Sequence, residues 1–182
     1  DDRALIRLVF GRWGVLDVDV SAWVQRKQRI TLEMLGERSV LFPGVRELIQ
    51  HLKDQGSGKL AVVSSTWREN ILKTLEAAGL RESFDLIVAK EDVEQVKPHP
   101  ECYLKALSEL GATAAEAIAI EDSPTGYHSA RSAGIPVIAV GPRWFEPGAS
   151  NQGLVPEHRL RDFRDLREVL ESLSLVSTEP SR

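Results

Sequence analysis

The chain has 182 residues, of which 42% are hydrophobic and 27% charged, and its formal net charge is -4. This length suits one large domain, or a core domain with a partial appendage. The small negative charge provides no basic surface, so we expect no nucleic acid partner. No apolar run approaches the roughly 18 residues of a membrane span, so we expect no membrane association.

The single cysteine, Cys102, excludes an internal disulfide framework. It fits a reducing compartment, so we expect a cytoplasmic protein in which Cys102 is a small apolar filler of a helix. The chain opens with Asp1, without a signal-peptide pattern and without an initiator methionine, so truncation or processing is expected. The sequence predicts no particular oligomeric state.

The first predicted element is a helix that Ser21 caps and that runs to about Gly36. Pro43-Gly44 then forms a break, after which apolar residues recur at helical spacing over 45–52. From here on, strand-like and helical segments alternate. Short apolar runs bounded by turn residues predict buried strands near 60–64, 85–89, 117–121 and 137–140.

Helical segments separate these strands, and the alternation predicts an α/β fold, a Rossmann-like parallel sheet with helices on both faces. Two segments are less regular. Thr113 and Glu116 match a capping box, but the strand expected from Ala117 leaves little room for a helix there. The stretch 141–157 is typical of a loop, and a last helix is expected over 162–173.

Polar residues follow three of the predicted strands, at the edge where open parallel sheets bind ligands. Ser64 ends the first strand, Lys97 lies in the loop after the second, and the adjacent acids Glu121 and Asp122 end the third. Two neighbouring carboxylates repel each other unless a cation lies between them, which indicates a magnesium site. The alternative is an ordinary solvated turn.

These residue types also suit phosphoryl transfer, in which positioning and charge stabilisation do most of the catalysis. The hydroxyl of Ser64 and the backbone N–H groups after it, in Ser65 and Thr66, can hold anionic oxygens at a helix N-terminus. Lys97 can neutralise charge on a phosphoryl group. Taken singly, Ser64 could equally be a helix cap and Lys97 a solvated loop lysine.

The order of the motifs resembles the haloacid dehalogenase (HAD) superfamily, particularly its beta-phosphoglucomutase/phosphoglycolate phosphatase-like branch with a helical cap. LAVVSS resembles the second motif of that family, VKPHPECYLKAL the third, and IAIEDSPTGYHSARSAG the fourth. The match covers roughly residues 20–145. It implies a partial helical cap over 1–42 and a HAD-like core, without its first strand, over 43–182.

The resemblance implies that Ser64 and Lys97 are catalytic, that Glu121 and Asp122 bind Mg²⁺, and that the substrate is a small phosphorylated metabolite. The same resemblance places Lys27 near the substrate's phosphate, although a solvated helix face explains this lysine equally well. Two functions stay open for the parent protein, a magnesium-dependent phosphatase and a sugar phosphomutase of the beta-phosphoglucomutase kind. The third alternative is that this chain is a non-catalytic HAD-like fragment or binding module.

The first motif of that family, DxDx[TV] at the end of a buried strand, has no good counterpart. In the family its aspartate attacks the phosphoryl group. The only DxD here is Asp17-Val18-Asp19, which has a serine at the last position and only Val15-Leu16 as an apolar lead. We therefore expect the first strand upstream of Asp1. Because that strand is central in the family, between the strands that end at Ser64 and Glu121, its omission leaves a slot that must be refilled or closed.

Overall fold

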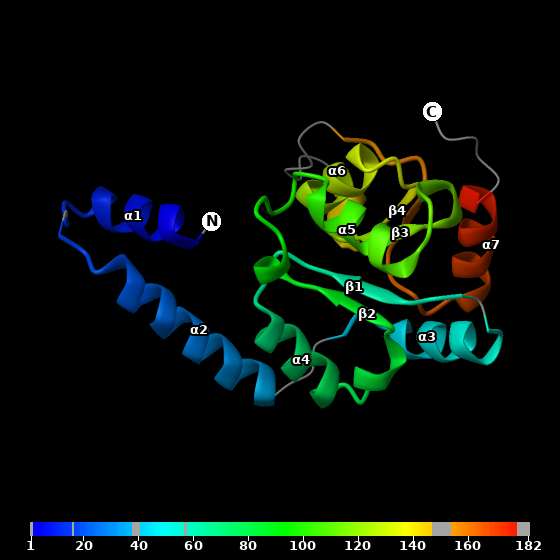
Figure 1. Cartoon of the computed structure of the whole chain (residues 1–182), viewed down its shortest axis with the longest axis horizontal. Helices are drawn as coiled ribbons and strands as arrows, with labels where there is room; N and C mark the ends of the chain where they lie inside the picture. Colours follow the sequence, from blue (N-terminus) through cyan, green and yellow to red (C-terminus); the bar gives the residue numbers. More distant parts are fainter. Residues whose placement is uncertain (1, 16, 38–40, 57, 147–153, 178–182) are drawn as a thin grey trace. The chain divides into compact units, whose positions relative to one another are not determined.

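The computed structural model describes residues 2–15, 17–37, 41–56, 58–146 and 154–177 (Figure 1). The chain divides into two compact units, Asp1–Ser39 and Val40–Arg182. Within the described ranges, no helix combines the length and the apolar character that crossing a membrane requires.

The smaller unit consists of two helices, α1 (Asp2–Arg12) and α2 (Val20–Glu37). The backbone N–H of Ala22 donates to Oδ1 of Asp19 at 3.0 Å. Asp19 therefore caps α2, and the expectation that Ser21 does so is wrong, because the helix already begins at Val20.

The larger unit confirms the predicted α/β fold, since strands and helices alternate along it. One strand, β5, lies between the predicted loop and the predicted last helix, where the sequence predicts no element, and the last helix begins later than expected. The elements are α3 (Val45–Asp54), β1 (Ala61–Val63), α4 (Arg68–Ala77), β2 (Leu86–Val88), α5 (Glu101–Leu110), β3 (Ala119–Glu121), α6 (Pro124–Ser132), β4 (Val137–Val140), β5 (Arg159–Leu160) and α7 (Leu166–Ser177).

All strand pairs are parallel, as predicted, but the strands form two sheets. In the first sheet β1 pairs with β2, and Val63 lies opposite Val88. In the second sheet β4 lies between β3 and β5, and Glu121 lies opposite Ala139. The expectation of one continuous sheet is therefore wrong for this chain, because no strand among the described residues joins β1 to β3.

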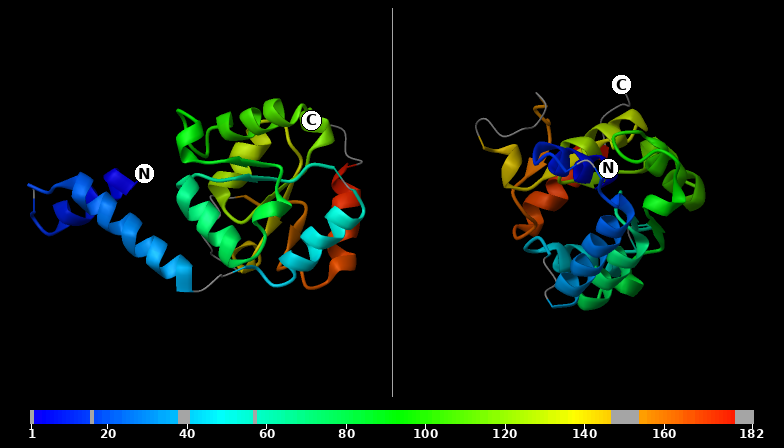
Figure 2. Two further views of the ribbon diagram at one scale, coloured as in Figure 1. Left: turned by 60° about the horizontal axis from the view of Figure 1, so that its bottom comes forward. Right: turned by 90° about the vertical axis from the view of Figure 1, so that its left-hand side faces the viewer.

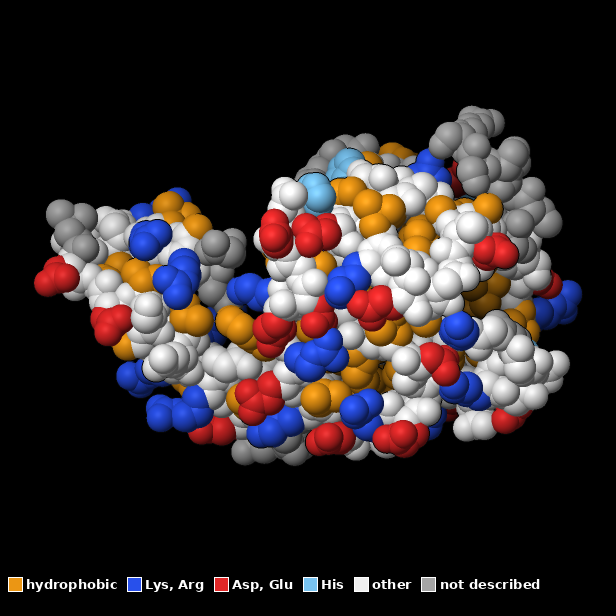
Figure 3. All heavy atoms as spheres, viewed as in Figure 1, with side chains coloured by type: hydrophobic (Ala, Val, Ile, Leu, Met, Phe, Trp, Pro, Cys, Tyr) orange, Lys and Arg blue, Asp and Glu red, His pale blue; other side chains and the backbone are white. Residues whose placement is uncertain are grey.

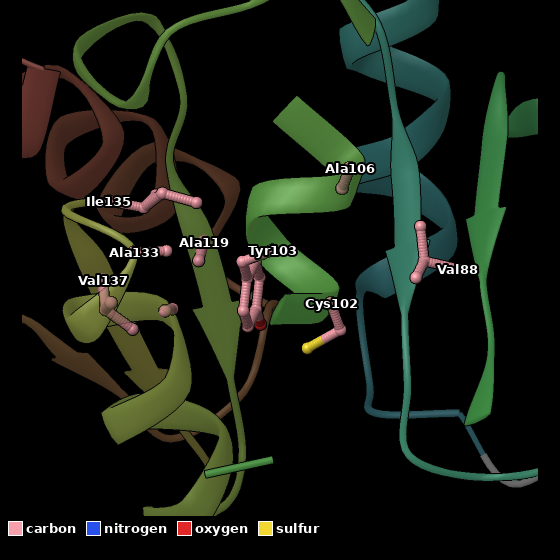
Figure 4. Packing of buried hydrophobic residues seen from close by; sticks show 9 residues of the cluster. Val88, Cys102, Tyr103, Ala106, Ala119, Ala133, Ile135 and Val137 are labelled. Atoms are coloured by element: carbon pink, nitrogen blue, oxygen red, sulfur yellow. The ribbon is translucent and has the colours of Figure 1, made fainter. Parts of the chain in front are cut away.

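Helices cover both faces of the strands (Figure 2). Ile87 packs in a cluster with residues of α3 and α4, whereas its neighbour Val88 packs in a cluster with residues of α5 and α6. Ile138 of β4 packs against α3 and α7. Figure 4 shows Cys102 and Tyr103 projecting from α5 within the cluster that contains Val88. Cys102 is 2% exposed, which confirms its predicted place as a filler.

Two turns position the core elements. Gly44, just before α3, has φ 81°, and a Cβ there would overlap the backbone of Phe163. Thr113 and Glu116 do form the capping box, with the Thr113 N–H donating to Oε2 of Glu116 at 2.9 Å. The box caps a 3₁₀ turn at Ala114–Glu116, which is short enough to fit before β3.

Candidate active site

Lys97 connects the strand ends at the carboxyl edge of the two sheets. Its ammonium group donates to the carbonyl oxygen of Val63 at 2.9 Å and forms an ion pair with Oε1 of Glu121. Its backbone N–H donates to Oγ of Ser65 at 3.3 Å. Lys97 therefore contacts both chain neighbours of Ser64 and the acid at the end of β3, so these residues meet at one edge.

Ser64 is oriented by its own loop. Its N–H extends the β1–β2 ladder by donating to the carbonyl of Val88 at 2.9 Å, and its Oγ accepts the N–H of Thr66 at 3.2 Å. The hydroxyl proton is thus left to donate to an anion. The helix that follows begins only at Arg68, whose N–H donates to both carboxylate oxygens of Glu91 at 3.1 Å. The Glu91 carboxylate thus already accepts the first N–H of α4. An anion beside Ser64 would therefore be bound by N–H groups of the loop and not by the N-terminus of α4.

Tyr103, on α5, is the site residue that the sequence did not single out. Its hydroxyl donates to the same Glu121 oxygen that pairs with Lys97, and the Lys97 ammonium lies 4.9 Å from the ring centroid. Burial first, and then the neighbouring Glu121 carboxylate, raise the pKa of the Tyr103 hydroxyl, so it stays protonated as a donor. A tyrosine among the apolar positions of a helix gives no signal of this role.

Glu121 lies between helix α6 and the two side chains that bind its carboxylate, Lys97 and Tyr103. Only 5% of the residue is exposed. A Cβ at Gly126 would lie no farther than 2.5 Å from either oxygen of its carboxylate, so this helix position must be glycine while Glu121 keeps its place. Ser123 begins the helix, and its Oγ accepts the N–H of Gly126 at 3.1 Å. The turn after β3 therefore fixes the acid as well as the helix.

Asp122 differs from Glu121 in its surroundings. It is exposed, and it makes no hydrogen bond or ion pair with any residue in the described ranges. Those ranges contain no group of three or more metal-ligating side chains. Mg²⁺ is usually bound through one or two carboxylates together with phosphate oxygens and water. The predicted acid pair fits such a site in part: Asp122 offers a carboxylate, whereas Glu121 is engaged with Lys97.

The other predicted residues lie in different places. Ser65 is exposed and Thr66 half-buried in the loop after β1, next to Ser64. Lys27 is exposed on α2, in the smaller unit. Asp17 lies between α1 and α2 and not on a strand.

A groove of about 1040 Å³ opens between β1 and β3. Most of its lining is apolar, including Leu60, Val63, Ile118 and Ile120, while Tyr103 and Asp122 also border it. Hydrophobic side chains are visible between charged ones on the viewed face of the larger unit (Figure 3). The two strands that border the groove, β1 and β3, are those between which the family resemblance places the missing first strand.

Known proteins resemble this chain in sequence. A sequence model described as haloacid dehalogenase-like hydrolase matches residues 10–140. Pyrophosphatase PpaX of Halalkalibacterium halodurans is 37% identical over 129 residues, which are 71% of this chain and 59% of that protein. A phosphorylated carbohydrates phosphatase of Thermotoga maritima is 36% identical over 111 residues, which are 61% of this chain and 49% of that protein. The chain thus spans about half to three fifths of the length of these relatives.

Solved structures share the fold. The structure of CbbY from Rhodobacter sphaeroides in complex with xylulose-(1,5)bisphosphate superposes with a TM-score of 0.71 and 30% identity, over 82% of this chain and 66% of that one. Beta-phosphoglucomutase from Clostridium difficile superposes with a TM-score of 0.79 over 98% of this chain and 79% of that one; at 18% identity this shows the fold alone.

Proposed function

Because this chain belongs to the haloacid dehalogenase-like hydrolases, we propose that it forms the phosphate-binding part of a magnesium-dependent phosphatase for a small phosphorylated metabolite. One observation carries the proposal: Lys97, whose side chain is 9% exposed, contacts both neighbours of Ser64 and the acid at the end of β3. A cation and a hydroxyl donor are thereby fixed at one edge of the strands, where a phosphoryl group needs both.

In this proposal Ser64 donates its hydroxyl proton to a phosphoryl oxygen, and the N–H group of Ser65 adds a further donor. Lys97 neutralises negative charge on the same group. Asp122 supplies a carboxylate to Mg²⁺, which would screen the charge of the phosphoryl oxygens when bound. Glu121 keeps the Lys97 ammonium in position and makes little direct contact with the metal.

The attacking carboxylate is proposed to come from a further strand in the groove between β1 and β3. A strand there would hydrogen-bond to both edges and would bring its carboxyl end to Lys97. Neither Asp17 nor Asp19 fits this role, since both lie between helices of the smaller unit. The described residues alone therefore bind the phosphoryl group without forming an aspartyl-phosphate.

The test is hydrolysis of a generic aryl phosphate, with and without Mg²⁺. The chain alone should give little or no turnover, and an added synthetic peptide with an apolar strand ending in Asp-x-Asp should raise it. The same peptide with Asn at the first acid is the matched control. Substantial turnover without peptide that Asp17→Asn abolishes would contradict the assignment. If the active peptide gives no turnover, a non-catalytic binding module becomes the better reading.

A further inference from the structure

The segment that carries Lys97 is anchored to the neighbouring helix at its beginning. The guanidinium of Arg68, the first residue of α4, donates to the carbonyl of Ile87 at 3.0 Å and also binds Oδ2 of Asp92. The same oxygen of Asp92 accepts the N–H of Ala89 at 2.7 Å. Asp92 therefore joins the end of β2, the loop after it and the start of α4 through one carboxylate.

Two more contacts join the same segments. Both carboxylate oxygens of Glu91 accept the Arg68 N–H, and the N–H of Lys90 donates to the carbonyl of Thr66 at 3.0 Å. The Lys90 ammonium also lies 4.8 Å from the ring centroid of Trp67. The loop that holds Ser64 and the loop that leads to Lys97 are thus tied together outside the site.

The same segment is held separately near Lys97. The carboxylate of Glu101 on α5 accepts the N–H groups of Glu94 and Gln95 at 2.7 and 2.9 Å. Between the two anchors the chain has little freedom to shift. The segment leads directly into Lys97, whose contacts with the two neighbours of Ser64 depend on where the segment lies.

We propose that Asp92, acting through Arg68, is a positioning residue that sets the place of Lys97 relative to Ser64. The inference rests on the proposed function, since it concerns affinity for the phosphoryl group. Asp92 touches neither Lys97 nor Ser64, and its side chain is 23% exposed. Its effect on phosphate is therefore indirect, and it arises from a charge-assisted pair that Asn cannot reproduce.

The test is the affinity of the full chain for inorganic phosphate by titration calorimetry. Asp92→Asn and Arg68→Lys should each weaken binding about threefold to tenfold, as residues that act through a neighbour do. The double variant should bind no more weakly than either single one, because the two act as one pair. Asp162→Asn is the matched control, since Asp162 also accepts a backbone N–H and an arginine, both from Arg164, away from the site. It should change the affinity less than about twofold.

A second readout keeps the two proposals apart. In proton–carbon NMR spectra, the two Hε protons of a held Lys97 should give separate signals that merge in Asp92→Asn. If the wild-type chain binds no phosphate, the phosphatase proposal fails, and this spectrum alone decides the positioning role. Unchanged phosphate affinity in Asp92→Asn, an equal loss in Asp162→Asn, or Lys97 signals that do not respond to Asp92→Asn would each overturn the inference.

Discussion

Gly126→Ala reverses the usual effect of this substitution in a helix. Replacing a helical glycine by alanine ordinarily stabilises a protein by about 0.5–1 kcal/mol. Here the new Cβ would overlap the carboxylate of Glu121, and α6 and β3 leave that buried side chain little room. Displacing Glu121 leaves Lys97 without its partner, and separating a buried pair costs about 3–5 kcal/mol. The expected net loss of stability is about 2–4 kcal/mol.

The measurement is urea unfolding followed by circular dichroism. The matched background is Glu121→Ala, which removes the overlapping atoms. In that background the new methyl group no longer meets the carboxylate, so Gly126→Ala should stabilise the chain by about 0.5–1 kcal/mol through its helix propensity. If Gly126→Ala alone stabilises the chain, the carboxylate does not lie against α6 and the reasoning is refuted.

Three further predictions concern the same region. Tyr103→Phe removes a donor to a buried carboxylate and should cost about 1.5–3 kcal/mol in urea unfolding; an unchanged midpoint would show that Glu121 does not need this hydroxyl. Asp122→Asn, at an exposed position, should change stability by less than about 0.5 kcal/mol. It should nevertheless weaken Mg²⁺ binding in calorimetry, and an unchanged Mg²⁺ affinity would show that Asp122 is not a metal ligand. The N–H groups of Glu94 and Gln95 lower the pKa of Glu101 from its ordinary 4.5. The stability that this carboxylate contributes is therefore present above pH 4.5, and it is lost as the pH falls through the lower pKa that Glu101 has in the folded protein. In an NMR titration, the two amide signals should move together with a midpoint below pH 4.5, and a midpoint at or above it would contradict the contact.

The sequence alone was sufficient for the parallel strands, the alternating helices, the positions of Ser64 and the two acids at strand ends, and the position of Lys97 in the loop after β2. These features depend on local patterns, namely apolar runs of strand length, turn residues and helical spacing. The same patterns gave a wrong cap for α2 and missed β5, because Asp19 and Ser21 are equally good caps and a two-residue strand has no periodicity.

Only the tertiary structure decided what the two acids do. Adjacent in the sequence, Glu121 and Asp122 read as one metal-binding pair, yet one is buried against Lys97 and Tyr103 and the other is exposed. Neighbours at the end of a strand point to opposite sides, so packing gives them different partners. Those partners come from the loop after β2 and from α5. Contacts between segments that are distant in the sequence cannot be predicted from a local pattern. The division into two sheets has the same origin, since it depends on which strand edges meet after folding.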